Sequence, residues 1–167
     1  VAGAFTLTLN SLSAGDIVHA YIDDETADGS VLSPVAAGNI SGFDIYQDRL
    51  IVRNDYPAGA GYTTNADVAG ADNGDADIVY SVTGNALAVD AGKELLVWSG
   101  DEYRPGGAVS TTDMDIRGTL TAESNTFTVA GDWAQNGTFS AGTGTVNLNG
   151  TGTQTVTGNS AFYNLVC

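Results

Sequence analysis

The sequence has little of several residue types on which common functional sites depend. Among 167 residues there is one cysteine, Cys167, which excludes an internal disulfide framework and a cysteine-based zinc site. The only histidine, His19, excludes a histidine-rich metal site and has no evident partner for a Ser-His-Asp centre. Five Lys and Arg residues stand against 20 Asp and Glu, a net charge of −15. Because phosphate groups are bound by clustered Lys and Arg, we expect neither nucleic acid nor an anionic membrane surface as a partner.

Long apolar runs and helical periodicity are also missing. No segment approaches the run of about 18 apolar residues that spans a membrane as a helix, so we expect no membrane span of that kind. Glycine or β-branched residues interrupt the apolar residues at helical spacing. Alternation of apolar and polar residues is frequent instead, as in residues 5–9 (FTLTL) and 17–22 (IVHAYI), and it predicts strands. We therefore expect an all-β fold.

Further strands are predicted wherever the alternation or a short apolar run recurs. They lie at residues 33–35, 43–46, 50–52, 78–82, 86–89 and 95–98. The segment 55–77 is predicted to be a loop, because proline and glycine punctuate it at Pro57, Gly59 and Gly70. The sequence begins at Val1 with neither an initiating methionine nor a basic segment, which we interpret as a processed or excised end.

A repeat with an offset of 19 residues is present in the last third of the chain. Residues 118–122 (GTLTA) return as residues 137–141 (GTFSA). Later pairs at the same offset are Thr126 with Thr145, Phe127 with Val146, Val129 with Leu148 and Gly131 with Gly150. Such a unit is typical of a β-solenoid rung, whose inward face is buried only by stacking on the next rung. A meander or sandwich with similar hairpins is the alternative.

The repeat follows a change of texture around residues 104–107 (RPGG). Beyond this point the chain is rich in threonine and glycine and has few bulky residues. We therefore predict a β-rich unit over residues 1–107, followed by stacked β-solenoid rungs, similar to a parallel β-helix, over residues 108–167. The two parts need not be separate, since residues 86–98 already have the pattern of strand, turn and strand.

One long segment carries a resemblance to known proteins. Residues 132–165 have the sequence DWAQNGTFSAGTGTVNLNGTGTQTVTGNSAFYNL. The successive motifs G-x-W, N-G-T-F, G-T-G-T-V and F-Y-N-L resemble repeat modules of large secreted or cell-surface bacterial β-solenoid proteins. Residues 43–53 (FDIYQDRLIVR) and 92–100 (GKELLVWSG) are similar to the module that often precedes them. The resemblance implies a bacterial origin and a secreted, extracellular or cell-surface location.

The function expected from these observations is structural. In the proteins that this chain resembles, F-Y-N-L leads into further rungs, so we interpret the chain as a fragment or as a subunit completed by a neighbour. An open solenoid end presents unpaired backbone groups, to which another strand can add. We expect a non-enzymatic subunit or segment of a self-assembling cell-surface filament, sheath or stalk. Its partners are copies of itself or adjoining segments of a larger surface protein. The residues predicted to form the joining edges are Phe5, Leu7, Leu9, Phe162, Tyr163 and Leu165.

An acidic segment is the best candidate for a metal site. Residues 72–77 (DNGDAD) alternate carboxylates around a glycine, as in the first half of a calcium loop, where oxygen ligands converge on one ion. We therefore name Asp72, Asp75 and Asp77 as candidate calcium ligands and expect no other cofactor. Thr83 stands where an EF-hand has its bidentate glutamate, so an exposed turn is the alternative. A second acidic segment, residues 23–28, is expected to be a solvated loop.

Two other functions are considered. An adhesin-type carbohydrate-binding module, dependent on calcium, would use exposed aromatic side chains, although strand alternation places most of them in a core or at a rung end. The candidates are Tyr21, Tyr46, Tyr80, Trp98 and Trp133. A polysaccharide hydrolase or lyase would use Asp113, Asp115 and Arg117, which share one face of a strand. Such an enzyme needs a long groove, more rungs and more basic residues, so we expect no enzyme.

Overall fold

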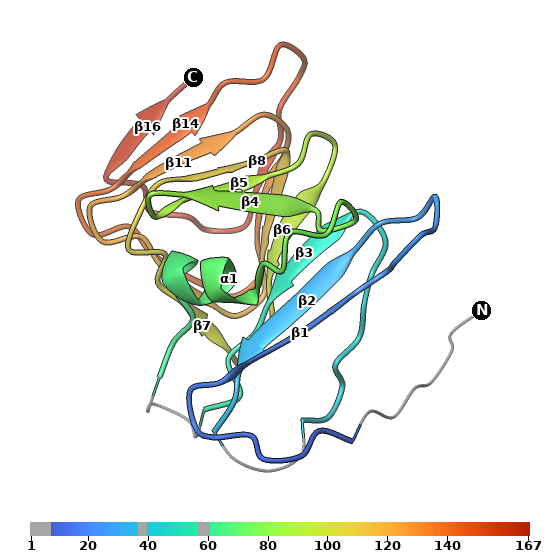
Figure 1. Ribbon diagram of the computed structural model, residues 1–167. Helices are drawn as coiled ribbons and strands as arrows, with labels where there is room; N and C mark the ends of the chain where they lie inside the picture. The colour runs from blue at the N-terminus through green and yellow to red at the C-terminus, as the bar shows by residue number, and fades with distance from the viewer. Residues whose placement is uncertain (1–7, 37–39, 57–60) are drawn as a thin grey trace.

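The computed structural model describes residues 8–36, 40–56 and 61–167 (Figure 1). Over these residues the chain forms three sheets and one short helix, so the expected all-β fold is confirmed except for that helix. The seven-stranded sheet has the order β1-β2-β3-β6-β9-β12-β15. Its strands are β1 (Ile17–Tyr21), β2 (Ser30–Pro34), β3 (Arg49–Val52), β6 (Glu94–Val97), β9 (Asp113–Ile116), β12 (Trp133–Gln135) and β15 (Val156–Thr157).

The two other sheets complete the walls of the structure. The six-stranded sheet has the order β16-β14-β11-β8-β5-β4, and the three-stranded sheet has the order β13-β10-β7. The former contains β4 (Tyr80–Thr83), β5 (Ala86–Val89), β8 (Val109–Thr111), β11 (Thr126–Val129), β14 (Thr145–Leu148) and β16 (Asn164–Val166). The latter contains β7 (Glu102–Tyr103), β10 (Thr119–Thr121) and β13 (Thr138–Ser140).

Successive strands of the repeat belong to the three sheets one after another, and each turn of the solenoid stacks on the preceding turn. Strands β9, β10 and β11 form one turn, and β12, β13 and β14 form the next, in parallel with it. Leu120 is paired with Phe139, and Phe127 with Val146, which is the offset of 19 residues seen in the sequence. The repeat is therefore a β-solenoid rung, and the alternative of a meander or sandwich is excluded, because those folds pair neighbouring strands antiparallel.

Parallel stacking also extends upstream of the repeat. Strand β2 pairs with β3, β3 with β6 and β6 with β9, all in parallel. The pair Leu95 and Met114 already has the offset of 19 residues. The seven-stranded sheet thus contains strands from both sides of the predicted boundary between residues 107 and 108. One apolar cluster likewise extends from Leu32 to Leu148.

Apolar side chains cover both faces of part of the seven-stranded sheet. On its outer face Val31, Ile51 and Leu96 are fully buried beneath Phe43 and Ile45. Residues 43–46 were predicted to form a strand, and the structure corrects this. Strand β3 is already paired on both sides, by β2 and β6, so no edge is free for these residues, and their side chains cover the sheet instead.

The helix α1 (Asn65–Ala71) lies within a segment that the sequence predicts to be a loop. Thr64 and Asp67 form a capping box, in which each side chain accepts a hydrogen bond from the other residue's backbone N–H. Val68 is fully buried and joins the core. With seven residues, the helix is too short for its periodicity to stand out, and the T-x-x-D pattern is its only signal in the sequence.

The N-terminal end of the solenoid is closed. Strand β1 pairs antiparallel with β2, and β4 pairs antiparallel with β5 through a turn at Gly84 and Asn85, which have φ of 61° and 88°. The helix α1 packs against all four strands and covers the core between them (Figure 1). Of the residues predicted to form a joining edge at this end, Leu9 is 44% exposed and belongs to no strand. Phe5 and Leu7 lie outside the described residues.

Candidate functional site

The C-terminal end of the solenoid differs from the N-terminal end because its core is uncovered. In one inward-facing row of the six-stranded sheet, Phe127 is 0% exposed and Val146 is 2% exposed, but Leu165 is 45% exposed. In the corresponding row of the seven-stranded sheet, Trp133 is 0% exposed and Val156 is 43% exposed. Among the described residues, nothing stacks beyond the last rung, which β15 and β16 form (Figure 1).

Three residues predicted to form a joining edge gather at this last rung. Leu165 ends its inward row, and Tyr163 is 63% exposed. Phe162 is half-buried, with its ring centroid 5.5 Å from that of Trp133. Two further exposed residues of this rung, Val156 and Val166, were not singled out from the sequence. Val156 is 43% exposed and Val166 is 50% exposed. Their signal was the continuation of the strand pattern into one more rung.

The uncovered end also carries no charged side chain. From Trp133 to Cys167 the sequence contains no Asp, Glu, Lys, Arg or His, so every charged residue precedes Trp133. The net charge of −15 is therefore confined to the rest of the molecule. We call the uncovered surface formed by Val156, Phe162, Tyr163, Leu165 and Val166, which has no charged side chain, the terminal face.

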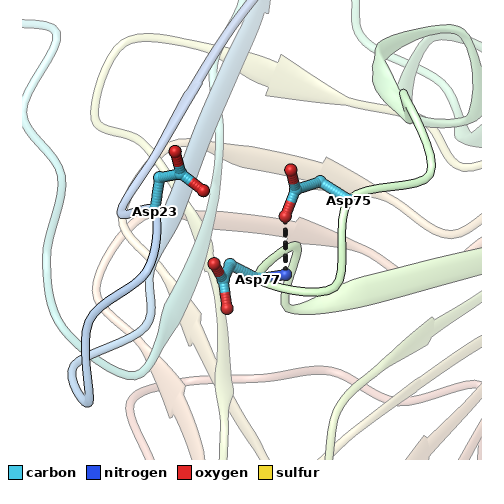
Figure 2. A group of neighbouring side chains, drawn as sticks. All are labelled: Asp23, Asp75 and Asp77. Atoms are coloured by element: carbon cyan, nitrogen blue, oxygen red, sulfur yellow. Dashed lines mark hydrogen bonds between the residues drawn. The ribbon is translucent and has the colours of Figure 1, made fainter.

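A cluster of three carboxylates lies near the closed end. Asp23, from the loop after β1, meets Asp75 and Asp77, from the loop between α1 and β4, and one oxygen of each lies within 4.8 Å of the others (Figure 2). Asp75 and Asp77 were predicted as calcium ligands. Asp72, the third predicted ligand, lies outside this group, and its Oδ1 accepts a hydrogen bond from the Gly74 N–H at 2.8 Å. Asp23 was assigned to a solvated loop, and only the fold brings it to the other two.

The three carboxylates are an unfavourable arrangement without a cation. Desolvation, with repulsion from Asp24, Asp75 and Asp77, raises the pKa of Asp23. Two backbone N–H groups partly compensate: that of Asp24 donates to Asp77 Oδ2 at 2.7 Å, and that of Asp77 donates to Asp75 Oδ1 at 3.0 Å. Convergent carboxylate oxygens are the ligands that Ca²⁺ prefers, and such an ion would join the β1 loop to the loop after α1.

We expect calcium to raise the midpoint of thermal unfolding, because an ion bound by the folded chain alone stabilises it by mass action. The variants Asp75→Asn and Asp77→Asn should lose this increase. The matched control is Asp72→Asn, which should keep it, since Asp72 is outside the group of three. Differential scanning calorimetry with and without a chelator measures all four proteins. An increase that Asp72→Asn abolishes, or no increase in the unsubstituted protein, would contradict this assignment.

The only histidine, His19, connects the edge strand β1 to helix α1 through a hydrogen bond. His19 Nδ1 donates to the carbonyl oxygen of Ala71, the last residue of α1, at 3.0 Å. The rings of Tyr21 and Tyr80 lie beside it, with centroids 5.2 and 5.7 Å away. Desolvation lowers the pKa of His19, although the bond to Ala71 and the charge of Asp72 oppose it. This half-buried histidine is therefore part of the closed end.

Most of the aromatic side chains considered for carbohydrate binding are buried or packed against another ring. Trp133 is fully buried and its Nε1 donates to Ser160 Oγ at 2.8 Å, so it offers no surface to a sugar. Tyr80 is 4% exposed. Tyr46 and Trp98 stack on each other with centroids 6.0 Å apart, and the Arg53 guanidinium lies 5.8 Å from the Trp98 ring.

The acidic residues considered for catalysis connect neighbouring rungs. Asp115 and Arg117 do share a face, and Asp115 Oδ2 accepts from Arg117 Nε at 2.7 Å. Asp115 Oδ1 accepts from Asn136 Nδ2 on the next rung at 3.1 Å. Asp113 Oδ1 likewise accepts from the backbone N–H of Asp132 at 2.6 Å. Both carboxylates are thus held by hydrogen bonds that stabilise the stack.

Comparison of the chain with models of protein families, with curated proteins and with solved structures gives no match. Within residues 8–36, 40–56 and 61–167, no helix has the length and apolar character needed to cross a membrane.

Proposed function

We propose that this chain is a non-enzymatic structural module of an extracellular, cell-surface assembly, a subunit or segment of a filament, sheath or stalk. The observation that carries the proposal is the terminal face, where two inward rows of a continuous core end uncovered. Solenoid proteins require a polar cap where the core ends, because the last apolar layer is otherwise left in water. We therefore expect the terminal face to be covered in the assembly.

The joining role belongs to the C-terminal end. There the strands β15 and β16 have one unpaired edge each, and strand addition satisfies such backbone groups. At the other end α1, β1 and β4 already cover the core. The module therefore has one closed end and one joining end, whereas the sequence alone led us to expect a joining edge at both.

The extracellular location is supported by composition and by resemblance. The chain has five Lys and Arg residues in 167, an acidic balance that suits surroundings containing salt or calcium. The motifs between Asp132 and Leu165 resemble modules of secreted and surface-anchored bacterial proteins. The same balance disfavours nucleic acid as a partner, since phosphate binding needs clustered basic residues.

An antibody raised against the folded chain tests the location and the structural role together. On intact cells that make the protein, we expect immunogold label on material that projects from the surface, and mild external proteolysis should remove it. An antibody against a cytosolic protein is the control and should label only permeabilised cells. Label that requires permeabilisation, or that stays in the cell interior, would overturn the proposal.

A calcium-dependent binding module is the second candidate, favoured by the cluster of Asp23, Asp75 and Asp77. It has less support as a carbohydrate-binding module, because Trp133 and Tyr80 are buried. Under this candidate calcium would fix the loops at the closed end for contact with a ligand, and the calcium titration described above is its first test.

A further inference from the structure

We infer that Asn73 is a site of self-catalysed deamidation, at which the chain converts this side chain to aspartate or isoaspartate through a cyclic imide with Gly74. In this reaction the backbone nitrogen of the following residue attacks the side-chain amide, and a glycine, without Cβ, permits the close approach. The inference goes beyond the proposed function and does not involve the terminal face. Three hydrogen bonds around the Asn73–Gly74 peptide carry it, each at an atom that takes part in the reaction.

The first hydrogen bond pairs the attacking nitrogen with a base. Asn73 and Gly74 are exposed in the loop between α1 and β4. Gly74 has φ of 80°, and a Cβ there would meet no heavy atom within 4 Å, so no neighbour blocks movement of its backbone. Its N–H donates to Asp72 Oδ1 at 2.8 Å. A carboxylate in this position can accept the proton as the nitrogen attacks, which is the role of a general base.

The other two hydrogen bonds orient and polarise the side-chain amide of Asn73. The backbone N–H of Asp75 donates to Asn73 Oδ1 at 3.0 Å. This oxygen becomes negatively charged when the side-chain carbon is attacked, and a backbone N–H aimed at it lowers the energy of that state. Asn73 Nδ2, the leaving nitrogen, donates to the hydroxyl oxygen of Tyr21 at 3.2 Å. The carbonyl oxygen and the leaving nitrogen are therefore held on separate partners.

The reaction needs no reagent other than water. A bond forms between Gly74 N and Asn73 Cγ, and the N–H proton passes to Asp72. The bond between Cγ and Nδ2 then breaks, this nitrogen takes up the proton, and ammonia leaves. Water opens the imide at either carbonyl, which gives aspartate or isoaspartate. The product lacks the donor to Tyr21, so the loop loses a hydrogen bond that joins it to β1 at the closed end.

The chain contains two further Asn-Gly pairs that serve as internal controls, Asn136–Gly137 and Asn149–Gly150. The Gly137 N–H donates to the carbonyl oxygen of Ile116 at 2.7 Å, and the Gly150 N–H donates to Gln154 Oε1 at 2.9 Å. Neither acceptor is a carboxylate. A Cβ at either glycine would lie within 2.1 Å of a backbone oxygen, so these backbones are packed against the preceding rung. The dipeptide alone predicts deamidation at all three asparagines, whereas the fold favours Asn73.

Peptide mapping by mass spectrometry, during incubation of the purified chain at neutral pH, tests this inference. We expect Asn73 to deamidate at least about tenfold faster than Asn136 and Asn149, as assistance by a positioned base implies. In concentrated urea the three rates should converge, because the neighbouring groups are then dispersed. Equal rates in the folded chain would overturn the inference. So would an Asn73 that reacts as fast in the unfolded chain as in the folded one.

The variant Asp72→Asn tests the role of the base. It keeps an oxygen that can accept from the Gly74 N–H but removes the basic carboxylate, so deamidation at Asn73 should slow at least about tenfold. The charge-matched control is Glu25→Gln, which removes an exposed carboxylate from the loop between β1 and β2 and should deamidate like the unsubstituted chain. An unchanged rate in Asp72→Asn, or an equal loss in Glu25→Gln, would overturn the assignment. None of these outcomes affects the surface labelling that tests the proposed function.

Discussion

Replacement of Trp133 by alanine is expected to lower the free energy of unfolding by about 3–5 kcal/mol, because it removes the largest fully buried side chain of the core. The indole has edge contacts with Phe139 and Phe162, whose ring centroids lie 4.9 and 5.5 Å away. Both rings would face a cavity in the variant, and Ser160 would lose its donor. Urea unfolding followed by far-ultraviolet circular dichroism measures the change.

The other tryptophan provides the control for this prediction. Trp98 lies on the outer face of the seven-stranded sheet and is only partly buried, so Trp98→Ala leaves less of a cavity and should cost clearly less than Trp133→Ala. Equal losses from the two variants would show that the indole of Trp133 does not hold the last rungs together.

Gly137→Ala is expected to destabilise the protein by about 3 kcal/mol, a large effect for the addition of one methyl group. A Cβ atom at this corner would lie 2.1 Å from the carbonyl oxygen of Gly118 and 2.5 Å from that of Arg117, both on the preceding rung. Two backbone hydrogen bonds join the rungs at this point, from the Gly137 N–H to the Ile116 oxygen and from the Thr138 N–H to the Gly118 oxygen. The rungs would have to move apart, weakening both bonds.

Gly152→Ala is the matched control for the corner glycine. A Cβ at Gly152 would have no heavy atom within 4 Å, and its φ is not positive. We therefore expect it to leave the urea midpoint unchanged or to raise it slightly, since alanine restricts the unfolded chain. A Gly137→Ala variant as stable as Gly152→Ala would show that the rungs do not approach as closely as described.

The repeat could be predicted from the sequence because each of its members has the same neighbours. Phe127 and Val146 occupy equivalent inward positions on consecutive rungs, so the packing requirement that selects one also selects the other. The constant offset is therefore the number of residues in one turn of the solenoid. The strands β5 and β6 were found for a similar reason, since alternation and short apolar runs follow directly from burial on one or both faces of a sheet.

The closed end could not be predicted in the same way, because it is built once and has no repeat. Helix α1 is short and its burial depends on Val68, a single apolar residue among alanines and polar groups. The partner of Asp75 and Asp77 is Asp23, which is more than 50 residues away in the chain and is brought to them only by the position of β1. No pattern within a window of sequence connects these residues.

Amide hydrogen exchange, measured strand by strand, tests most directly the central claim that the core is uncovered at the last rung. The account predicts that in dilute protein the amides of β16 exchange much faster than those of β11, which has a strand on each side. Amides of β16 that exchange as slowly as those of β11 would contradict the account.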